Sequence, residues 1–414
     1  MSDLAILRGF KDVILADAEK FSAIVAAASQ LAKNYNFSKA YFPILEQSST
    51  YKRVLGESSD IVNKEMYSFI DKGENQVTLR PEFTAGIARS VITNGLYDKL
   101  PLKFFSYGPL FRYERPQKGR QRQFYQLNFE IFGNESYLAE LEMLLLLNEL
   151  IEHLGLKQKV TLELNSLGSP EARQNYRAAL KTYLQDYRSQ LSEDSQKRLE
   201  VNPLRILDSK SADDQQILED APAIDEFYSA EDQEFFAKLQ EKLSAFNISF
   251  KLNPKLVRGL DYYTQTVFEY TTELLGAQNA VFAGGRYDNL IAQMGGKATP
   301  AVGFAGGLER LVELAELDLQ QKQKIIVVAF SEQQQDYVLK LVQLLRQQNL
   351  TVEQILGGGN LGKKLKKAAK HAPQYVVICG EDEIKNDQLQ LKNFVTGNEQ
   401  FLSQAELVEY LVKL

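Results

Sequence analysis

Residues 111–132, FRYERPQKGRQRQFYQLNFEIF, decide the fold of this 414-residue chain. Two runs rich in aromatic and aliphatic residues, 104–114 and 124–132, lie on either side of a polar loop that contains Gly119. Apolar runs of this kind around a glycine-containing loop predict a long antiparallel hairpin. If the loop closes near Lys118 and Gly119, Arg112 should lie opposite Gln126 or a near neighbour.

The second strand of this hairpin should have one polar and one apolar face, because side chains alternate along a strand. The polar face carries Phe124, Gln126, Asn128 and Glu130, and the apolar face carries Tyr125, Leu127, Phe129 and Ile131. On the first strand Arg112 and Glu114 likewise share a face. A face with a guanidinium, two carboxylates, amides and an aromatic ring suits a polar ligand. Solvated charges on an open sheet explain it equally well. The loop favours a polyphosphate or a nucleic-acid backbone, since it adds four cations: Arg115, Lys118, Arg120 and Arg122.

The hairpin lies in a first domain, residues 1–320, with mixed helical and strand signals. A helical pattern near the start is formed by Ala18, Phe21, Val25, Ala28 and Leu31. Residues 41–46 predict an apolar strand, and Pro43 within it suits a sheet edge or an interface. The polar segment at about 170–250 predicts inserted surface helices, because strand signals resume at 255–270 and 280–282. Glycine-rich residues 303–307 then lead into a helix from Leu308, a pattern that a simple strand-to-helix turn would also give.

A second domain, 321–414, follows a polar linker near residues 319–322. Its strands, at 324–330, 351–356 and 375–379, alternate with helices at 333–347 and 362–371. This alternation predicts a small, mainly parallel α/β domain. One helical face carries Lys363, Lys366, Lys367 and Lys370, with Lys364 beside them. Taken alone, a lysine face is usually only solvated.

Composition narrows the class of protein without choosing an activity. The net charge of −6 argues weakly against a protein that coats nucleic acid nonspecifically. The single cysteine excludes an intramolecular disulfide, and two histidines leave little for a zinc site, so no resident metal is expected. The N-terminus lacks a secretory or transit pattern and no apolar run is long enough for a membrane span. A cytoplasmic protein without membrane contact is the expectation.

Besides the hairpin, several other sequence motifs are spread along the chain. Residues 54–57 (VLGE) and 64–67 (KEMY) precede 79–86 (LRPEFTAG), and later come 256–263 (LVRGLDYY), 266–269 (TVFE), 283–288 (AGGRYD) and 303–310 (GFAGGLER). Together with the hairpin, they resemble the motifs of class II aminoacyl-tRNA synthetases in their histidyl form, in the same order. The resemblance implies an α+β fold: a class II antiparallel sheet with flanking helices and a helical insertion, plus a C-terminal α/β anticodon-binding domain.

The resemblance also implies an activity, and it implies which substrate the residues of each motif would bind. The family activates L-histidine with ATP, releasing pyrophosphate, and transfers the histidyl group to the 3′ end of tRNA(His). The residues that would bind ATP, with Mg²⁺ bridging its phosphates, are Arg112, Glu114, Arg120, Phe124 and Arg310. The residues that would bind histidine are Glu82, Thr84, Arg112, Gln126, Glu130, Arg258, Tyr262 and Tyr263.

Arg258 is the predicted catalytic cation, helped by Arg112, because negative charge grows on the α-phosphate during activation. The residues that would contact tRNA are Lys118, Arg122, Lys363, Lys366, Lys367 and Lys370. Pro43 lies where the family places an interface proline, which implies a homodimer.

Three positions depart from the family pattern. Phe83 stands where members usually have glycine, so its ring must point away from the substrate or reshape the pocket. Tyr113 and Tyr125 replace common histidines, and by alternation both should face away from ATP. A catalytically inactive paralogue, such as the regulatory subunit of ATP phosphoribosyltransferase, is one alternative, but such chains usually lack the second domain and lose Arg258. A pure RNA-binding module would leave the ATP-type residues unexplained.

Overall fold

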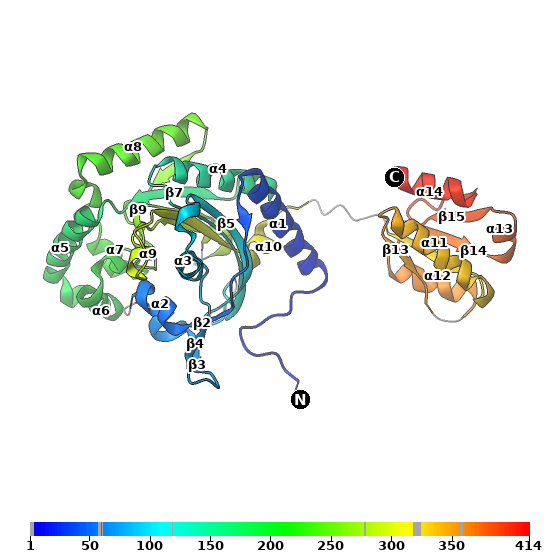
Figure 1. The fold of residues 1–414 in the computed structure, drawn as a ribbon, viewed down its shortest axis with the longest axis horizontal. Helices are drawn as coiled ribbons and strands as arrows, with labels where there is room; N and C mark the ends of the chain where they lie inside the picture. The colour runs from blue at the N-terminus through cyan, green and yellow to red at the C-terminus, as the bar shows by residue number, and fades with distance from the viewer. Residues whose placement is uncertain are drawn as a thin grey trace. The chain divides into compact units, whose positions relative to one another are not determined.

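The computed structural model describes residues 4–56, 59, 61–117, 119–276, 279–317, 324–356 and 359–414. The chain divides into two compact units, residues 1–317 and 318–414, each with its own core (Figure 1). The linker predicted near residues 319–322 lies outside the described residues. No helix within the described ranges combines the length and apolarity needed to cross a membrane.

The first unit is built on an eight-stranded sheet in the order β1-β5-β6-β11-β10-β9-β7-β8. All neighbours are antiparallel except β1–β5 and β7–β8, which are parallel. The strands are β1 Ser38–Lys39, β5 Leu102–Phe111, β6 Gln123–Phe132, β7 Thr161–Ser166, β8 Phe250–Leu252, β9 Thr264–Thr271, β10 Ala280–Arg286 and β11 Ala301–Gly307. This confirms an antiparallel sheet, but residues 255–263, predicted as strand, precede β9 as a loop.

Helices cover both faces of the sheet. One face is closed by α1 Leu15–Asn34, α4 Leu138–His153 and α10 Leu308–Leu314, which pack on the apolar side chains of β6. The other face meets α2 Ser48–Leu55, α3 Thr84–Thr93 and α9 Leu290–Gln293. The predicted alternation along β6 is confirmed, because Leu127, Phe129 and Ile131 are buried in the first of these two cores. The polar side chains of β6 therefore point toward the α3 side.

The predicted register of the hairpin is wrong. Phe111 pairs with Gln123, and the Arg112 amide donates to the Arg122 carbonyl at 2.9 Å, so Arg112 lies opposite Arg122 and Gln126 lies opposite Gly108. The loop does close at Gln117 and Arg120, as expected. The two sides of the loop are unequal: residues 113–116 separate Arg112 from Gln117, whereas only residue 121 separates Arg120 from Arg122. This asymmetry shifts the strands.

The predicted strand at 41–46 is also mostly wrong. Residues 41–44 have no strand pairing, and β2 (Leu45–Gln47) begins after them in a small sheet with β4 Gln76–Leu79 and β3 Tyr67–Ile70. Pro43 has no N–H to donate to a ladder. The Arg80 guanidinium instead donates a hydrogen bond to the Phe42 carbonyl at 2.8 Å. This contact holds the segment in an irregular conformation.

The inserted segment is helical, as predicted. It contains α5 Pro170–Asp186, α6 Glu193–Val201, the 3₁₀ turn η4 Pro203–Ile206, α7 Ala212–Ile217 and α8 Ala230–Ala245. Ser169, Ser192 and Ser229 precede three of these helices, and each side-chain oxygen accepts from an amide of the first turn. The insertion lies beside β7 and β9 (green in Figure 1).

The second unit has a five-stranded sheet in the order β13-β12-β14-β15-β16. Its strands are β12 Ile325–Ala329, β13 Val352–Gln354, β14 Tyr375–Cys379, β15 Leu389–Asn393 and β16 Glu399–Leu402, with helices α11 Gln335–Gln347, α12 Leu361–Lys370, α13 Glu381–Lys385 and α14 Gln404–Lys413. The first three strands are parallel, whereas β15 and β16 join in antiparallel fashion. The expectation of a mainly parallel sheet is therefore only half right, because the connection from β14 to β15 holds one short helix and returns the chain directly.

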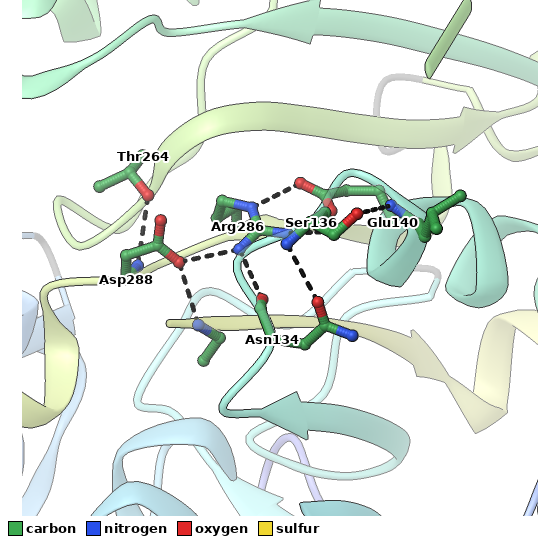
Figure 2. A network of polar contacts seen from close by, with 8 residues as sticks. Asn134, Ser136, Glu140, Thr264, Arg286 and Asp288 are labelled. Carbon is green, nitrogen blue, oxygen red and sulfur yellow. Dashed lines mark hydrogen bonds and ion pairs between the residues drawn. The ribbon is translucent and has the colours of Figure 1, made fainter. Parts of the chain in front are cut away.

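A buried ion pair ties β10 to the start of α4 (Figure 2). Both Arg286 and Glu140 have no exposed surface. The guanidinium donates to both oxygens of Glu140, to the carbonyls of Asn134 and Ser136 at 3.0 Å each, and to Asp288 at 3.1 Å. These contacts use all five N–H groups of the arginine. The pair therefore fixes the end of β10, directly before Tyr287.

Replacing Arg286 should strongly destabilise the first unit. Arg286→Met leaves the Glu140 carboxylate buried without its cation, and such a loss typically costs about 3–5 kcal/mol. Urea unfolding followed by circular dichroism measures the change. Lys238→Met, which removes an exposed ion pair to Glu234 one helical turn away, is the control and should leave the unfolding free energy unchanged. Equal unfolding midpoints for the two variants would contradict this role of the pair.

Candidate active site

Glu130 lies at the centre of a narrow slot of about 90 Å³ on the polar face of the sheet. Its carboxylate accepts hydrogen bonds from Thr84 Oγ1 at 2.6 Å, from Asn128 Nδ2 at 2.9 Å and from the Tyr287 hydroxyl. The residue is buried, and burial raises its pKa to about 7, although the three hydrogen bonds lower it. The slot therefore contains an acceptor that is strong but costly to ionise.

Gly303 on β11 makes room for this carboxylate. A Cβ atom at position 303 would overlap the Glu130 side chain directly. The neighbouring Gly284 on β10 is equally tight, because its Cβ would overlap the Gly303 carbonyl. Gly303 therefore belongs to a closely packed strand that runs to Gly307, and residues 303–307 are not a simple turn.

Three tyrosines line the slot beside Glu130. The rings of Tyr262 and Tyr263 lie 4.8 Å apart, and the Tyr287 ring lies edge-on to Tyr262 at 5.4 Å. Burial, followed by the nearby phenols and carboxylates, raises the pKa of Tyr262 and Tyr287 well above the usual value. Both hydroxyls therefore stay protonated, and that of Tyr287 donates to Glu130.

Glu82 is the second carboxylate of the slot. Its oxygens accept from the amides of Thr84 at 2.6 Å and Ala85 at 2.7 Å, so the side chain caps the first turn of α3. Burial raises its pKa, whereas these amide hydrogen bonds lower it. The cap fixes the position of the carboxylate at the slot wall.

A wider cleft of about 250 Å³ adjoins the slot, and Arg112, Gln126 and Arg258 line both. The Arg112 guanidinium lies 5.4 Å from the centre of the Phe124 ring, and its Nε donates to the Pro81 carbonyl at 2.9 Å. Arg310 donates to the carbonyls of Gly119 at 3.2 Å and Ala280 at 2.6 Å. Burial, followed by Arg120, lowers the pKa of Arg310. Concentrated positive charge beside an aromatic ring suits a nucleoside polyphosphate.

Two predicted site residues that line the cleft have acidic partners. Arg120 forms an ion pair with Glu114, and Arg258 forms one with Glu269 of β9. Arg258 also lies 5.9 Å from the Tyr263 ring. Both cations line the cleft. Glu269 ends the motif at 266–269, and the sequence alone does not predict its pairing with Arg258.

The structure gathers most of the predicted site residues in these two cavities. The slot is lined by Glu82, Thr84, Arg112, Gln126, Glu130, Arg258, Tyr262 and Tyr263, and the cleft by Arg112, Glu114, Arg120, Phe124 and Arg310. Arg122 lies outside both, with its guanidinium 3.7 Å from the Tyr113 ring, and Lys118 lies outside the described residues. The remaining predicted lysines are exposed on α12 of the second unit.

Sequence reasoning missed the partners of Glu130. Alternation had placed Asn128 on the correct face, but it received no role. Tyr287 lies in a quoted motif, and only the fold brings it to Glu130. Phe83 does not line the slot: its ring packs on the Arg80 guanidinium at 4.3 Å, so the departure at this position leaves the pocket free. Tyr113 and Tyr125 likewise do not line the cleft.

Comparisons with known proteins cover nearly the whole chain. The family described as Histidyl-tRNA synthetase matches residues 9–311, and Anticodon binding domain matches residues 324–414. A histidine–tRNA ligase of Wolbachia pipientis (strain wPip of Culex pipiens) is 46% identical over 403 residues, covering 97% of this chain and 98% of that protein. One from Rickettsia felis is 43% identical over 408 residues, covering 98% of each. The crystal structure of apo S. aureus histidyl-tRNA synthetase has a TM-score of 0.83 at 29% identity, covering 99% of this chain and 100% of that one.

The antiparallel sheet, its arginine-lined cleft and the separate anticodon-binding domain define a class II aminoacyl-tRNA synthetase. The matches decide the family within that class. The chain belongs to the histidyl-tRNA synthetase family.

The raised pKa of Glu130 should make stability depend on pH. The carboxyl has an ordinary value of 4.5 and a folded value of about 7, so the folded protein binds more protons between these two values. Its contribution to stability is complete below pH 4.5 and is lost as the pH rises through 7. The free energy of unfolding of wild type minus that of Glu130→Gln should fall by up to about 3 kcal/mol from pH 4.5 to pH 8.

Urea titrations of both proteins across this range give the difference. The comparison isolates the effect of Glu130. Burial also raises the pKa of Glu309 to about 7, but Glu309 titrates in both proteins and its effect cancels in the difference. A difference that is constant with pH would contradict the burial argument.

Proposed function

We propose that this chain is an ATP-dependent histidine–tRNA ligase that forms histidyl-adenylate and pyrophosphate, and then transfers histidine to tRNA(His). The observation that carries the proposal is the joining of two cavities. A slot with a buried carboxylate and three phenols opens into an arginine-lined cleft, and Arg112, Gln126 and Arg258 line both. An amino acid and a nucleotide would thus meet at these shared residues.

Histidine fits the slot by its hydrogen-bonding pattern. Glu130 and Tyr263, with Tyr262 beside them, would bind the two imidazole nitrogens, one of which donates while the other accepts. Glu82, Thr84 and Gln126 would take the α-ammonium group. In the structure Thr84 donates to Glu130, so its hydroxyl also links the two ends of the slot. A side chain that cannot satisfy these buried groups binds at a large cost, which gives specificity without an editing site.

ATP fits the wider cleft. Phe124 and Arg310 would cover the two faces of adenine, and Glu114 would accept from its amino group. Because Glu114 is paired with Arg120, nucleotide binding would open this pair and release Arg120 for a phosphate. ATP enters as its magnesium complex, so Mg²⁺ is part of the substrate. Among the described residues, His, Cys, Asp and Glu side chains form no group of three or more that could hold a metal ion.

Activation joins the two substrates. A histidine carboxylate oxygen attacks the α-phosphorus of ATP, a new P–O bond forms, and the bond to the pyrophosphate oxygen breaks. Negative charge grows on the nonbridging oxygens, and Arg258 and Arg112 stabilise it more in the transition state than in the ground state. In the second step the 3′-terminal ribose hydroxyl of the tRNA attacks the histidyl carbonyl and AMP leaves.

An inactive paralogue is the alternative function. The presence of Arg258 in the shared region, the complete cleft and the C-terminal domain favour an active ligase instead. We place this activity in the cytoplasm.

The exposed lysines of α12 are proposed to contact tRNA. Lys363, Lys366, Lys367 and Lys370 are exposed, whereas Lys364 is buried and donates to the Ala329 carbonyl at 2.9 Å. Lys364 therefore supports the fold, and the other four leave a cationic face for an RNA backbone.

A homodimer through the Pro43 region belongs to the same proposal. Large apolar side chains around β2 and β3 are exposed, including Tyr41 at 75% and Ile70 at 72%. Burying such side chains would favour association.

Arg258→Ala should slow histidine-dependent ATP–pyrophosphate exchange about 100- to 1000-fold, because one fixed donor to the growing charge is lost. Lys242→Ala, on an exposed helix of the insertion, is the control and should exchange at the wild-type rate. Full activity of Arg258→Ala would remove the catalytic assignment. Exchange by wild type with another amino acid, or with none, would refute the specificity.

Sedimentation velocity tests the dimer. Wild type should sediment as a dimer, and Tyr41→Glu should shift it toward monomer, because the carboxylate would be buried in the interface. Phe246→Glu, a change at an exposed apolar residue of the insertion, is the control. A wild-type monomer with full ligase activity would refute this part of the proposal.

A further inference from the structure

Arg80 is a buried arginine behind the candidate active site, and only 5% of its surface is exposed. Its guanidinium donates to the carbonyls of Pro109 at 3.0 Å and Phe42 at 2.8 Å. Its own amide donates to the Ile44 carbonyl at 2.9 Å, and its carbonyl accepts from the Phe111 amide at 3.1 Å. One residue therefore ties the chain before β2 to the end of β5.

The ring of Phe83 covers one face of this guanidinium. The ring centre lies 4.3 Å from Arg80 Cζ, and the phenylalanine is 2% exposed. A cation is held most strongly on an aromatic face where water is excluded. Gly108 of β5 lies against both side chains, because a Cβ atom there would meet Arg80 Nη2 at 2.7 Å and Phe83 Cζ at 3.7 Å. Glycine at position 83, the usual residue of the family, would leave the guanidinium without this face.

The stack closes the segment from residue 80 to residue 83 on itself. Pro81 and Glu82 lie between the two stacked residues, and each is part of the site. The Pro81 carbonyl accepts from Arg112 Nε at 2.9 Å, and the Glu82 carboxylate caps α3 at the wall of the slot. With both ends of the segment held, the direction of the Pro81 carbonyl is fixed.

The position of Arg112 depends on that carbonyl. In the part of the chain that the structure describes, the bond to Pro81 is the shortest polar contact of this side chain, since the nearest oxygen of Glu114 lies 4.0 Å away. Arg112 lines both the slot and the cleft. A displacement of about 1 Å at such a group can slow a reaction about 100-fold.

We propose that Arg80 and Phe83 form a positioning pair for the activation step. Their stack directs the Pro81 carbonyl at Arg112, and so holds the guanidinium where the histidine carboxylate and the α-phosphate would meet. The inference rests on the proposed ligase function. Neither side chain lines the slot or the cleft, so the pair acts only through the residues that it holds.

Substitution of the ring tests the proposal. Phe83→Leu keeps an apolar side chain but removes the aromatic face. It should lower kcat for histidine-dependent ATP–pyrophosphate exchange about 10-fold and leave the KM for ATP within about 2-fold, because a group that acts in the transition state is misplaced. Phe268→Leu is the matched control, since Phe268 is equally buried in the core on the other face of the sheet. Its kcat should stay within about 2-fold of wild type.

Double variants separate positioning from a general loss of stability. In an Arg112→Ala background, Phe83→Leu should change the remaining exchange rate by less than about 2-fold, because the group that the pair positions is gone. The same should hold in an Arg80→Met background, where the ring has lost its cation. General instability would instead slow these backgrounds by the same factor as wild type.

The opposite results overturn the inference. A wild-type kcat in Phe83→Leu would show that the ring is not needed. An equal 10-fold loss in the Arg112→Ala background would show that the ring does not act through Arg112, and an equal loss in Phe268→Leu would assign the effect to packing alone. Absence of histidine-dependent exchange in the wild type would instead refute the ligase function, and this inference with it.

Discussion

The buried carboxylate of Glu130 is the constraint on which the site depends. A carboxylate is costly to remove from water unless donors surround it, and here the donors come from three separate elements. Thr84 starts α3, Asn128 lies on β6 itself, and Tyr287 follows β10. On the fourth side β11 approaches so closely that only glycine fits at position 303. The geometry of one side chain thus ties a helix to three neighbouring strands.

This arrangement links the core of the sheet to the chemistry of the slot. Arg286 and Tyr287 are adjacent in sequence, but their side chains contact different parts of the structure. The guanidinium of Arg286 is held by Glu140 and by two carbonyls of the turn before α4, and the phenol of Tyr287 binds Glu130. A fully paired arginine therefore sets where a tyrosine of the slot stands, although the arginine does not line the slot itself.

Much of this fold could be predicted from sequence, and what could not was tertiary in origin. Period-two alternation identified the polar face of β6, because each side chain of a strand has a fixed direction. The register of the hairpin escaped prediction because the two sides of the loop differ in length, and sequence does not show where the chain leaves the ladder. Pairs such as Glu140 with Arg286, or Glu130 with Tyr287, join distant segments and produce no periodic signal. The antiparallel half of the second sheet was missed because strand spacing alone does not give direction.

The close approach of Gly303 and Glu130 also bears on how such a slot can diverge. A larger residue at position 303 collides with the carboxylate, and a shorter residue at position 130 alone would leave three buried donors without an acceptor. Either single change destabilises the slot, so a slot of another shape would need both changes together. The two neighbouring strands therefore constrain the shape of the slot jointly, and neither position can be redesigned alone.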